Sequence, residues 1–187
     1  MKLYVIRHGE SETNSRKCYT GWCDVPLTEV GEGDALFARG VLSGIKFDKV
    51  FSSDLSRAVN TAKIALPEIT PELTPLLREF DVGSLANKPI KDLTENMRAS
   101  IAKNGFADFD GESRCEFYER IRKFLSLIEN SGCECIAAFS HNGFIRGLLE
   151  ILLGVKIPRK NLACGNCAVA VFEYDGNAWR LHSLFNK

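Results

Sequence analysis

The chain has 187 residues, with 24 lysines and arginines against 24 aspartates and glutamates, so its formal net charge at pH 7 is zero. This length is enough to bury a substantial core, and we expect residues 1–187 to form one domain. Because the chain has no overall positive field, we expect no nucleic acid and no membrane surface as a partner. An anionic ligand would need a local cluster of cations.

The chain starts with a short apolar run, residues 3–6, which predicts a β-strand ending in a tight turn at Gly9. Arg7 and His8 would then stand at the carboxyl edge of a sheet, where open α/β folds place their ligands. Gly9 lets backbone N–H groups approach an anion, so the segment suits a nucleophilic histidine held against a phosphoryl group. Taken alone, it fits better with a histidine that only hydrogen-bonds to a loop.

Alternating helix and strand signals follow. Residues 50–52 predict a second strand, and Ser53 is a candidate N-cap of the helix after it, whose apolar residues run from 55 to 66 at i, i+3 and i+4 spacing. Before this strand, Thr28 is a candidate N-cap for a helix. The apolar face of that helix would hold Val30, Phe37, Ala38, Val41 and Leu42.

The middle of the chain carries weaker signals. Three prolines between residues 67 and 75 break the next stretch into short extended pieces. Residues 84–112 have the weakest periodicity, and we expect them to form a lid over the site. A capping box of Ser113 and Glu116 then starts a helix with an apolar stripe, and Gly132 would end that helix.

The last third completes the pattern of an α/β protein. Residues 136–139 are apolar without alternation, which predicts a strand covered on both faces. Residues 143–153 predict a helix, and residues 168–174 and 179–185 predict a closing hairpin. Helices between strands imply crossovers, so we expect a three-layer α/β/α fold with a mostly parallel central sheet. Because the chain shows neither a signal-peptide pattern nor an apolar run of spanning length, we expect a cytoplasmic protein.

Three further polar residues lie where this layout brings strand ends together. His141 follows the strand at 136–139 and precedes a helix N-terminus, a position suited to an anion. Arg57 lies off the apolar stripe of the helix after the second strand, and Glu79 lies in a short stretch after the prolines. Taken singly, these residues have ordinary explanations as a satisfied histidine, a solvated arginine and a surface carboxylate.

The seven cysteines are odd in number and scattered, which fits reduced thiols. Cys164 and Cys167 have the spacing of a zinc knuckle, and Cys133 with Cys135 could supply a second pair. However, Cys135 and Cys167 each begin an apolar, strand-like run. We therefore expect small buried residues and no metal site.

Together these segments resemble the histidine phosphatase superfamily, the fold of cofactor-dependent phosphoglycerate mutases and many small phosphomonoesterases. The resemblance begins with Arg-His-Gly-Glu-Ser and covers nearly the whole chain. Its segments, in chain order, are residues 7–11, 20–28, 52–58, 77–83 and 140–143. Five pieces in order are far more specific than one motif. The compact size and the ending of the chain are similar to those of the α-ribazole phosphatases.

The resemblance implies a role for each matching residue. His8 would attack phosphorus and become a transient phosphohistidine, and Arg7, Arg57 and His141 would hold the phosphoryl oxygens. Glu79 would protonate the departing alcohol and then take a proton from water. Two nearby guanidiniums would also lower the pKa of His8 and keep it neutral. The remaining candidates for contact with the phosphate or the substrate body are Gly9, Ser11, Asn14, Thr20, Gly21 and Asn142. No cofactor and no metal are implied.

Departures from the family pattern bear on the reaction. Asn142 stands where many relatives have glycine, and residues 84–87 replace a common tryptophan-glutamate-glycine run. The chain has no Arg-Arg pair, and residues 83–113 lack the longer insertion with which the mutases grip a carboxylate. We therefore expect hydrolysis of a small phosphomonoester, which would be the main partner. A mutase-type phosphotransferase and a catalytically inactive relative that binds a phosphorylated ligand remain the alternatives.

Overall fold

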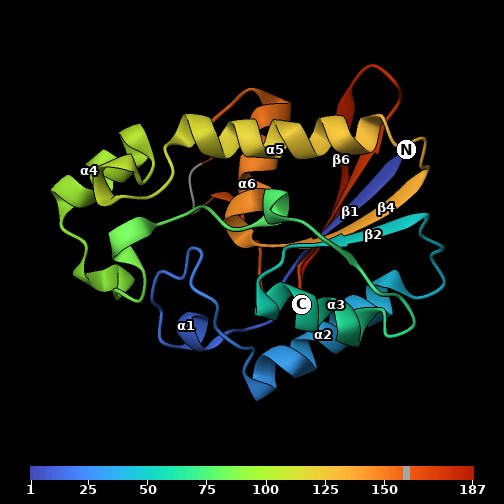
Figure 1. The fold of residues 1–187 in the computed structure, drawn as a ribbon, viewed down its shortest axis with the longest axis horizontal. Coiled ribbons are helices and arrows are strands. Elements are labelled where there is room, and N and C mark those ends of the chain that lie inside the picture. Colours follow the sequence, from blue (N-terminus) through green and yellow to red (C-terminus); the bar gives the residue numbers. More distant parts are fainter. Residues whose placement is uncertain (158–160) are drawn as a thin grey trace.

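A computed structural model describes residues 1–157 and 161–187, which form a twisted six-stranded sheet between two layers of helices (Figure 1). The strands are β1 (Lys2–Arg7), β2 (Lys49–Ser52), β3 (Glu72–Leu73), β4 (Cys135–Ser140), β5 (Val169–Tyr174) and β6 (Trp179–Phe185). The α-helices are α1 (Glu12–Ser15), α2 (Glu29–Leu42), α3 (Ser56–Ala65), α4 (Glu95–Asn104), α5 (Arg114–Glu129) and α6 (Asn142–Leu153). Short 3-10 turns lie at Pro75–Leu77, Gly83–Leu85, Ile90–Asp92 and Ala107–Phe109.

The sheet has the order β3-β2-β4-β1-β5-β6. The first four strands in this order are parallel to one another, and only β5 runs in the opposite direction, antiparallel to both β1 and β6. The predicted three-layer, mostly parallel fold is therefore confirmed. Its central strand, β1, lies between β4 and β5, so the segment that leaves β1 starts from the middle of the sheet.

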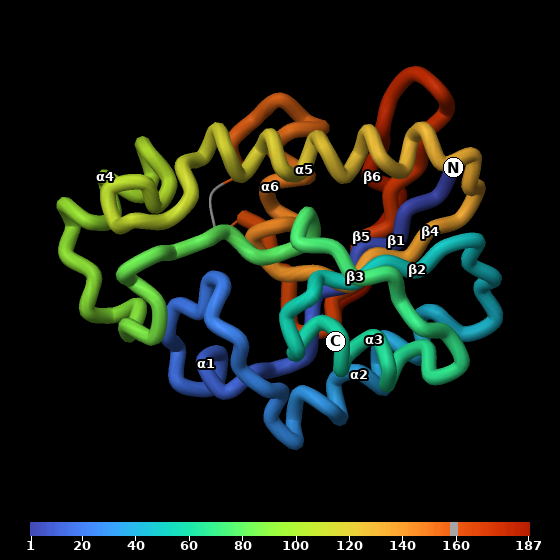
Figure 2. The backbone as a smooth tube through the Cα atoms, in the orientation of Figure 1, coloured from blue at the N-terminus to red at the C-terminus, as the bar shows by residue number. Residues whose placement is uncertain are grey.

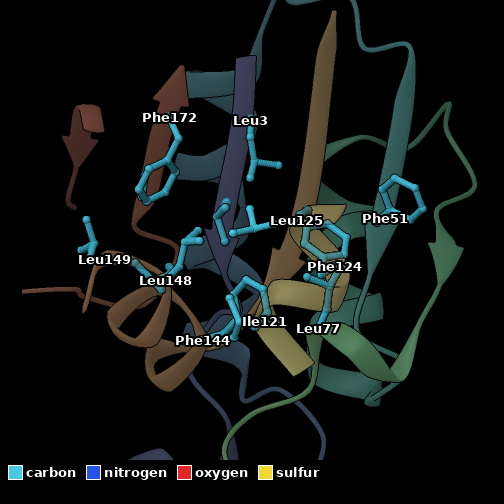
Figure 3. Packing of buried hydrophobic residues seen from close by; sticks show 14 of the residues in the cluster. Leu3, Phe51, Leu77, Ile121, Phe124, Leu125, Phe144, Leu148, Leu149 and Phe172 are labelled. Carbon is cyan, nitrogen blue, oxygen red and sulfur yellow. The ribbon is translucent and has the colours of Figure 1, made fainter. Parts of the chain in front are cut away.

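Each face of the sheet has its own apolar core. Helices α5 and α6 cover one face, where Phe124 and Phe144 pack against strand residues such as Leu3 and Phe172 (Figure 3). Helices α2 and α3 cover the other face, as the tube in Figure 2 shows, and there Leu42 and other residues of these helices pack against β1, β2, β4 and β5. Two covered faces explain why the run at 136–139 is apolar throughout.

The helix ends follow the predicted caps in part. Thr28 caps α2 and accepts a hydrogen bond from the Gly31 N–H, and Ser113 with Glu116 forms the predicted capping box of α5. Three predictions are corrected. Val30 is 59% exposed, because the buried face of α2 is centred on its alanines, Asp34 and Leu42. Leu55, not Ser53, is the N-cap of α3, and α5 already ends at Glu129, so Gly132 lies in the loop beyond it.

Residues 83–112, which we call the cap segment, form a separate end of the molecule beside α5 and α6 (Figure 1). The segment contains α4 and three 3-10 turns, although its periodicity is weak. Leu85, Leu93 and Phe106 of this segment form a small apolar cluster with Val82, the residue just before it. Helix α4 was missed because none of its residues is buried and only Met97 and Ile101 pack against this cluster, which is too short an apolar stripe to stand out in the sequence. The Thr94 N-cap was its one clear signal.

None of the helices in the described part of the chain combines the length and the apolar character that crossing a bilayer requires.

Candidate active site

The parallel strands β1 and β4 end side by side, with Arg7 opposite Ser140. The next residue on each strand is a histidine, and the rings of His8 and His141 lie with their centroids 5.0 Å apart at an angle of 64°. Both histidines are buried. Two segments separated by more than 130 residues thus meet at the carboxyl edge of the sheet, as the sequence predicted.

A backbone contact determines which nitrogen of His8 carries the hydrogen. Its Nδ1 lies 2.6 Å from the Gly9 carbonyl oxygen, which can only accept, so Nδ1 carries the hydrogen. In the neutral ring Nε2 then keeps its lone pair. Burial, followed by the charges of Arg57 and Arg7, holds the pKa of His8 well below its ordinary value. The predicted direction of the shift is confirmed, with burial as the larger cause, so the His8 ring is neutral at pH 7.

Arg57 and Arg7 bring positive charge to this histidine. Arg57, in the first turn of α3, donates from Nη1 to the Cys23 carbonyl at 2.8 Å and from Nη2 to the Gly21 carbonyl at 2.9 Å. Burial lowers its pKa to about 10, which leaves the guanidinium charged at neutral pH. Arg7 donates from Nη1 to the Cys164 carbonyl at 2.7 Å. These bonds fix both guanidiniums without neutralising them.

Several buried polar atoms at this point have no hydrogen-bond partner among the described residues. They include the Nε atoms of Arg7 and Arg57 and both ring nitrogens of His141. His141 is also the N-cap of α6, where the helix dipole favours an anion. A buried donor without a partner costs free energy unless a ligand satisfies it. The arrangement is therefore suited to binding an anionic group with several oxygens.

Glu79 lies in the loop after the 3-10 turn at Pro75–Leu77. Its Oε1 accepts from the Phe80 N–H at 2.8 Å and its Oε2 from the Gly143 N–H at 3.1 Å. A Cβ atom added at Gly143 would overlap Glu79 Oε1. The carboxylate thus lies directly against the first turn of α6, and any side chain at position 143 would displace it.

A cavity of about 190 Å³ lies between these groups. The predicted site residues that line it are Arg7, His8, Asn14, Thr20, Gly21, Arg57, Glu79 and Asn142. His141 lies fully buried beside the His8 ring and is not part of the lining.

The structure does not bring Gly9 and Ser11 to this cavity, contrary to the prediction. The Gly9 N–H donates to Thr61 Oγ1 at 3.0 Å, and a Cβ at Gly9 would overlap the Gly31 carbonyl. Ser11 is buried, and its hydroxyl bonds that of Thr13. Glycine is needed at position 9 because the loop after β1 passes close to α2. From the sequence motif alone, this packing requirement cannot be distinguished from anion binding.

A second cavity of about 430 Å³ continues from the first toward the cap segment. The two share six lining residues, namely Tyr19, Phe80, Ile90, Phe106, Gly143 and Arg146. The larger cavity adds apolar side chains such as Leu93 and Ile101, with Arg98, Arg114 and Glu150 among its polar residues. A ligand held at His8 by a phosphoryl group would extend its remaining body into this apolar space.

The sequence analysis missed Trp22 and Arg120, which contact the loop that carries Glu79. Trp22 Nε1 donates to the Glu79 carbonyl at 2.8 Å, and Arg120 Nη2 donates to the same oxygen at 2.9 Å. Arg120 lies outside the apolar stripe of α5, so in the sequence it resembles a solvated charge. Trp22 lies within a segment of the family resemblance but was not singled out.

The cysteines have free thiols, and Cys164 and Cys167 are buried. Burial raises the pKa of Cys164, and it raises that of Cys167 to about 12, so both are neutral thiols at pH 7. Among the described residues, no group of three or more histidine, cysteine and acidic side chains is placed to bind a metal ion. The contribution of Cys164 to the site is its carbonyl oxygen, which holds Arg7.

Comparisons with known proteins agree with this geometry. The family model described as "Histidine phosphatase superfamily (branch 1)" matches residues 3–187. The chain is 32% identical over 161 residues to the adenosylcobalamin/alpha-ribazole phosphatase of Salmonella typhimurium, covering 82% of this chain and 80% of that protein. It is 31% identical over 188 residues to a Yersinia pestis protein named "Probable phosphoglycerate mutase GpmB", covering 96% and 87%. The structure of TTHB049 from Thermus thermophilus is 31% identical, with a TM-score of 0.80 over the full length of both chains.

Proposed function

Since the chain belongs to the histidine phosphatase superfamily, we propose that it is a phosphomonoester hydrolase in which His8 carries the phosphoryl group. The observation that carries the proposal is the neutral His8, with Nδ1–H bonded to the Gly9 carbonyl and two charged guanidiniums beside it. Glu79 lines the same cavity and supplies the acid. A nucleophile, fixed positive charge and a proton donor are what phosphoryl transfer through histidine needs.

The proposed reaction has two displacements. In the first, the His8 Nε2 lone pair forms a bond to phosphorus while the bond from phosphorus to the ester oxygen breaks, and Glu79 gives that oxygen its proton. In the second, water attacks the phosphohistidine and gives a proton to Glu79. The P–N bond then breaks and its electron pair returns to Nε2. Arg7, Arg57 and His141 hold the phosphoryl oxygens throughout, where charge develops in the transition state.

We propose that this chemistry needs no metal ion. Arg7 and Arg57 already supply the fixed positive charge that Mg²⁺ provides in other phosphoryl-transfer enzymes. Their remaining unpartnered Nε atoms are buried and available to oxygens of the substrate. Turnover should therefore be unchanged after treatment with EDTA, and restoration by added divalent ions would contradict the proposal.

The second cavity favours an alcohol with a bulky apolar body. Its volume of about 430 Å³ and its aromatic side chains, such as Phe80 and Phe106, suit a planar group better than a small, charged glycerate. α-Ribazole 5′-phosphate, the substrate implied by the name of the Salmonella relative, is accordingly the first candidate.

One substrate panel tests the assignment. Released phosphate would be measured with α-ribazole 5′-phosphate, p-nitrophenyl phosphate, benzyl phosphate and 3-phosphoglycerate, the last also with a trace of its bisphosphate. We expect phosphate release from the bulky esters to exceed the interconversion of phosphoglycerates. Faster interconversion would identify a mutase instead. Binding of phosphate without turnover of any ester would identify the inactive, ligand-binding alternative.

A further inference from the structure

The side chain of Arg120 on α5 uses all of its hydrogen-bond donors on the loop that carries Glu79 and on Glu112. Its Nη1 donates to the carbonyls of Leu76 and Arg78 at 3.0 and 2.8 Å, and its Nη2 donates to the Glu79 carbonyl at 2.9 Å. Nε and Nη2 also donate to the two carboxylate oxygens of Glu112 at 2.8 and 2.7 Å. All five N–H groups of the guanidinium are thus used.

Glu112, at the end of the cap segment, extends this network along the chain. Its Oε2 also accepts from the Asp81 N–H at 3.0 Å, and its own N–H donates to the Asp81 carbonyl at 3.1 Å. The side chains of Arg120 and Glu112 are only 11% and 13% exposed, so solvent screens the pair weakly. The arginine and the carboxylate together hold the backbone on both sides of Glu79.

Two aromatic rings complete the surroundings of this guanidinium. Arg120 lies 5.8 Å from the ring centroid of Trp22 and 5.1 Å from that of Phe117. The Phe117 ring in turn stacks on Phe80, the residue after Glu79, with centroids 4.2 Å apart. Trp22 contributes its own hydrogen bond to the Glu79 carbonyl. The guanidinium therefore cannot shift without moving the loop.

We propose that Arg120 is a positioning residue for Glu79, with Glu112 and Trp22 as its supports. It fixes the Glu79 backbone so that the carboxylate stays at the Gly143 N–H and faces the ester oxygen. The inference rests on the proposed role of Glu79 as the acid. It depends on geometry more than on charge, because a lysine would keep the charge but offer three donors at one point instead of a planar fork.

The test compares two esters that differ in their need for a proton. p-Nitrophenolate leaves almost unaided, whereas the alkoxide of benzyl phosphate must be protonated as it departs. Arg120→Met and Arg120→Lys should lower kcat for benzyl phosphate on the order of tenfold to a hundredfold more than kcat for p-nitrophenyl phosphate. Arg122→Met, at an exposed position two residues further along α5, is the matched control and should leave the ratio unchanged.

The same substitutions in the Glu79→Gln variant separate a positioning role of Arg120 from a general structural effect. If Arg120 acts through Glu79, then adding Arg120→Met to Glu79→Gln should not change the ratio of the two esters any further. A loss that is equal for both esters, or a further change of the ratio in that background, would overturn the inference. Trp22→Phe keeps the ring but removes the N–H, and it should shift the ratio in the same direction by less.

Trp22→Phe also keeps the inference testable if the Arg120 variants do not fold. The outcomes separate this inference from the proposed function. If the native protein hydrolyses no ester of the panel, α-ribazole 5′-phosphate included, the hydrolase proposal fails. If it hydrolyses both and the ratio is the same in every folded Arg120 and Trp22 variant, only the positioning role fails.

Discussion

The active site has two sides. The sheet side, which would hold the phosphoryl group, is built at the ends of strands, whereas the loop side, which would face the alcohol, is built from loops. Arg7 and His8 come from the end of β1, and His141 comes from the end of β4, where backbone pairing fixes them. Glu79 lies in a loop without regular structure that side chains of α5 and the cap segment hold in place. The first side is suited to an invariant phosphoryl group, and the second can change with the alcohol.

Removal of the nucleophile gives the largest expected effect and tests the sheet side. His8→Ala should reduce turnover on the order of a thousandfold or more, because the proposed nucleophile is removed. Native protein quenched during turnover should carry a label that is lost in acid and kept in alkali, as a P–N bond requires. His182→Ala, at an exposed histidine on β6, is the control. A label that survives acid would point to an ester and contradict the role of His8.

The junction of the two sides is tested at Gly143. Gly143→Ala places a methyl group where Glu79 Oε1 lies, so the carboxylate must move away from the ester oxygen. We expect kcat for benzyl phosphate to fall on the order of a hundredfold, as misplacement of a catalytic group by about 1 Å can cause. Gly33→Ala on α2 meets no atom within 4 Å and serves as the control. Native activity in Gly143→Ala would show that the carboxylate is not held where the acid is needed.

The sheet side should also be sensitive to acid. The pKa values of His8 and His141 are well below the ordinary value, mainly because of burial. The unfolded chain therefore takes up protons first as the pH falls. The contribution of these histidines to stability is complete above about pH 6.5 and decreases below it, by up to about 1.4 kcal/mol per pH unit for each.

Urea unfolding of the ligand-free protein between about pH 7.5 and about pH 5 measures this slope. In His141→Gln, the part of this slope that comes from the two histidines should fall to about half. An unchanged slope in both His141→Gln and His8→Ala would show that these rings are not the groups that titrate.

Substitutions in the cap segment should have the smallest effects, and these should be limited to large substrates. Ile101, on α4, lines the second cavity but not the first. Ile101→Ala should raise KM for α-ribazole 5′-phosphate about fivefold, since the contact with a few methyl and methylene groups is lost, and should leave inhibition by inorganic phosphate unchanged. Equal effects on the substrate and on phosphate would show that the cavity does not bind the alcohol.

The sequence predicted the sheet side better than the loop side for a physical reason. His8, Arg57 and His141 follow or lie near strand ends, so periodicity along the chain places them at one edge. Arg120 and Trp22 act on a distant loop through contacts that only the folded chain brings together. Their own neighbours in the sequence carry no signal of that loop.

At Gly9 and Val30, by contrast, the sequence analysis assigned a role that the structure does not support. Gly9 was assigned to the ligand because a glycine after a strand can approach an anion, yet here it approaches Gly31 on α2. Val30 was assigned to the core by its spacing, whereas the first turn of α2 faces solvent at that position. In both cases the decisive information was the distance between two elements, which a single sequence does not contain.

The central place of β1 has a consequence for synthesis on the ribosome. Its neighbours in the sheet are β4, at residues 135–140, and β5, at residues 169–174. The strand that ends just before His8 is made first but meets its first partner only after about three quarters of the chain has been made. Such long-range pairing is slow, and until then the apolar residues of β1 stay exposed. The pairing of β1 therefore waits for β4, and activity cannot precede the completion of that strand, which is followed directly by His141.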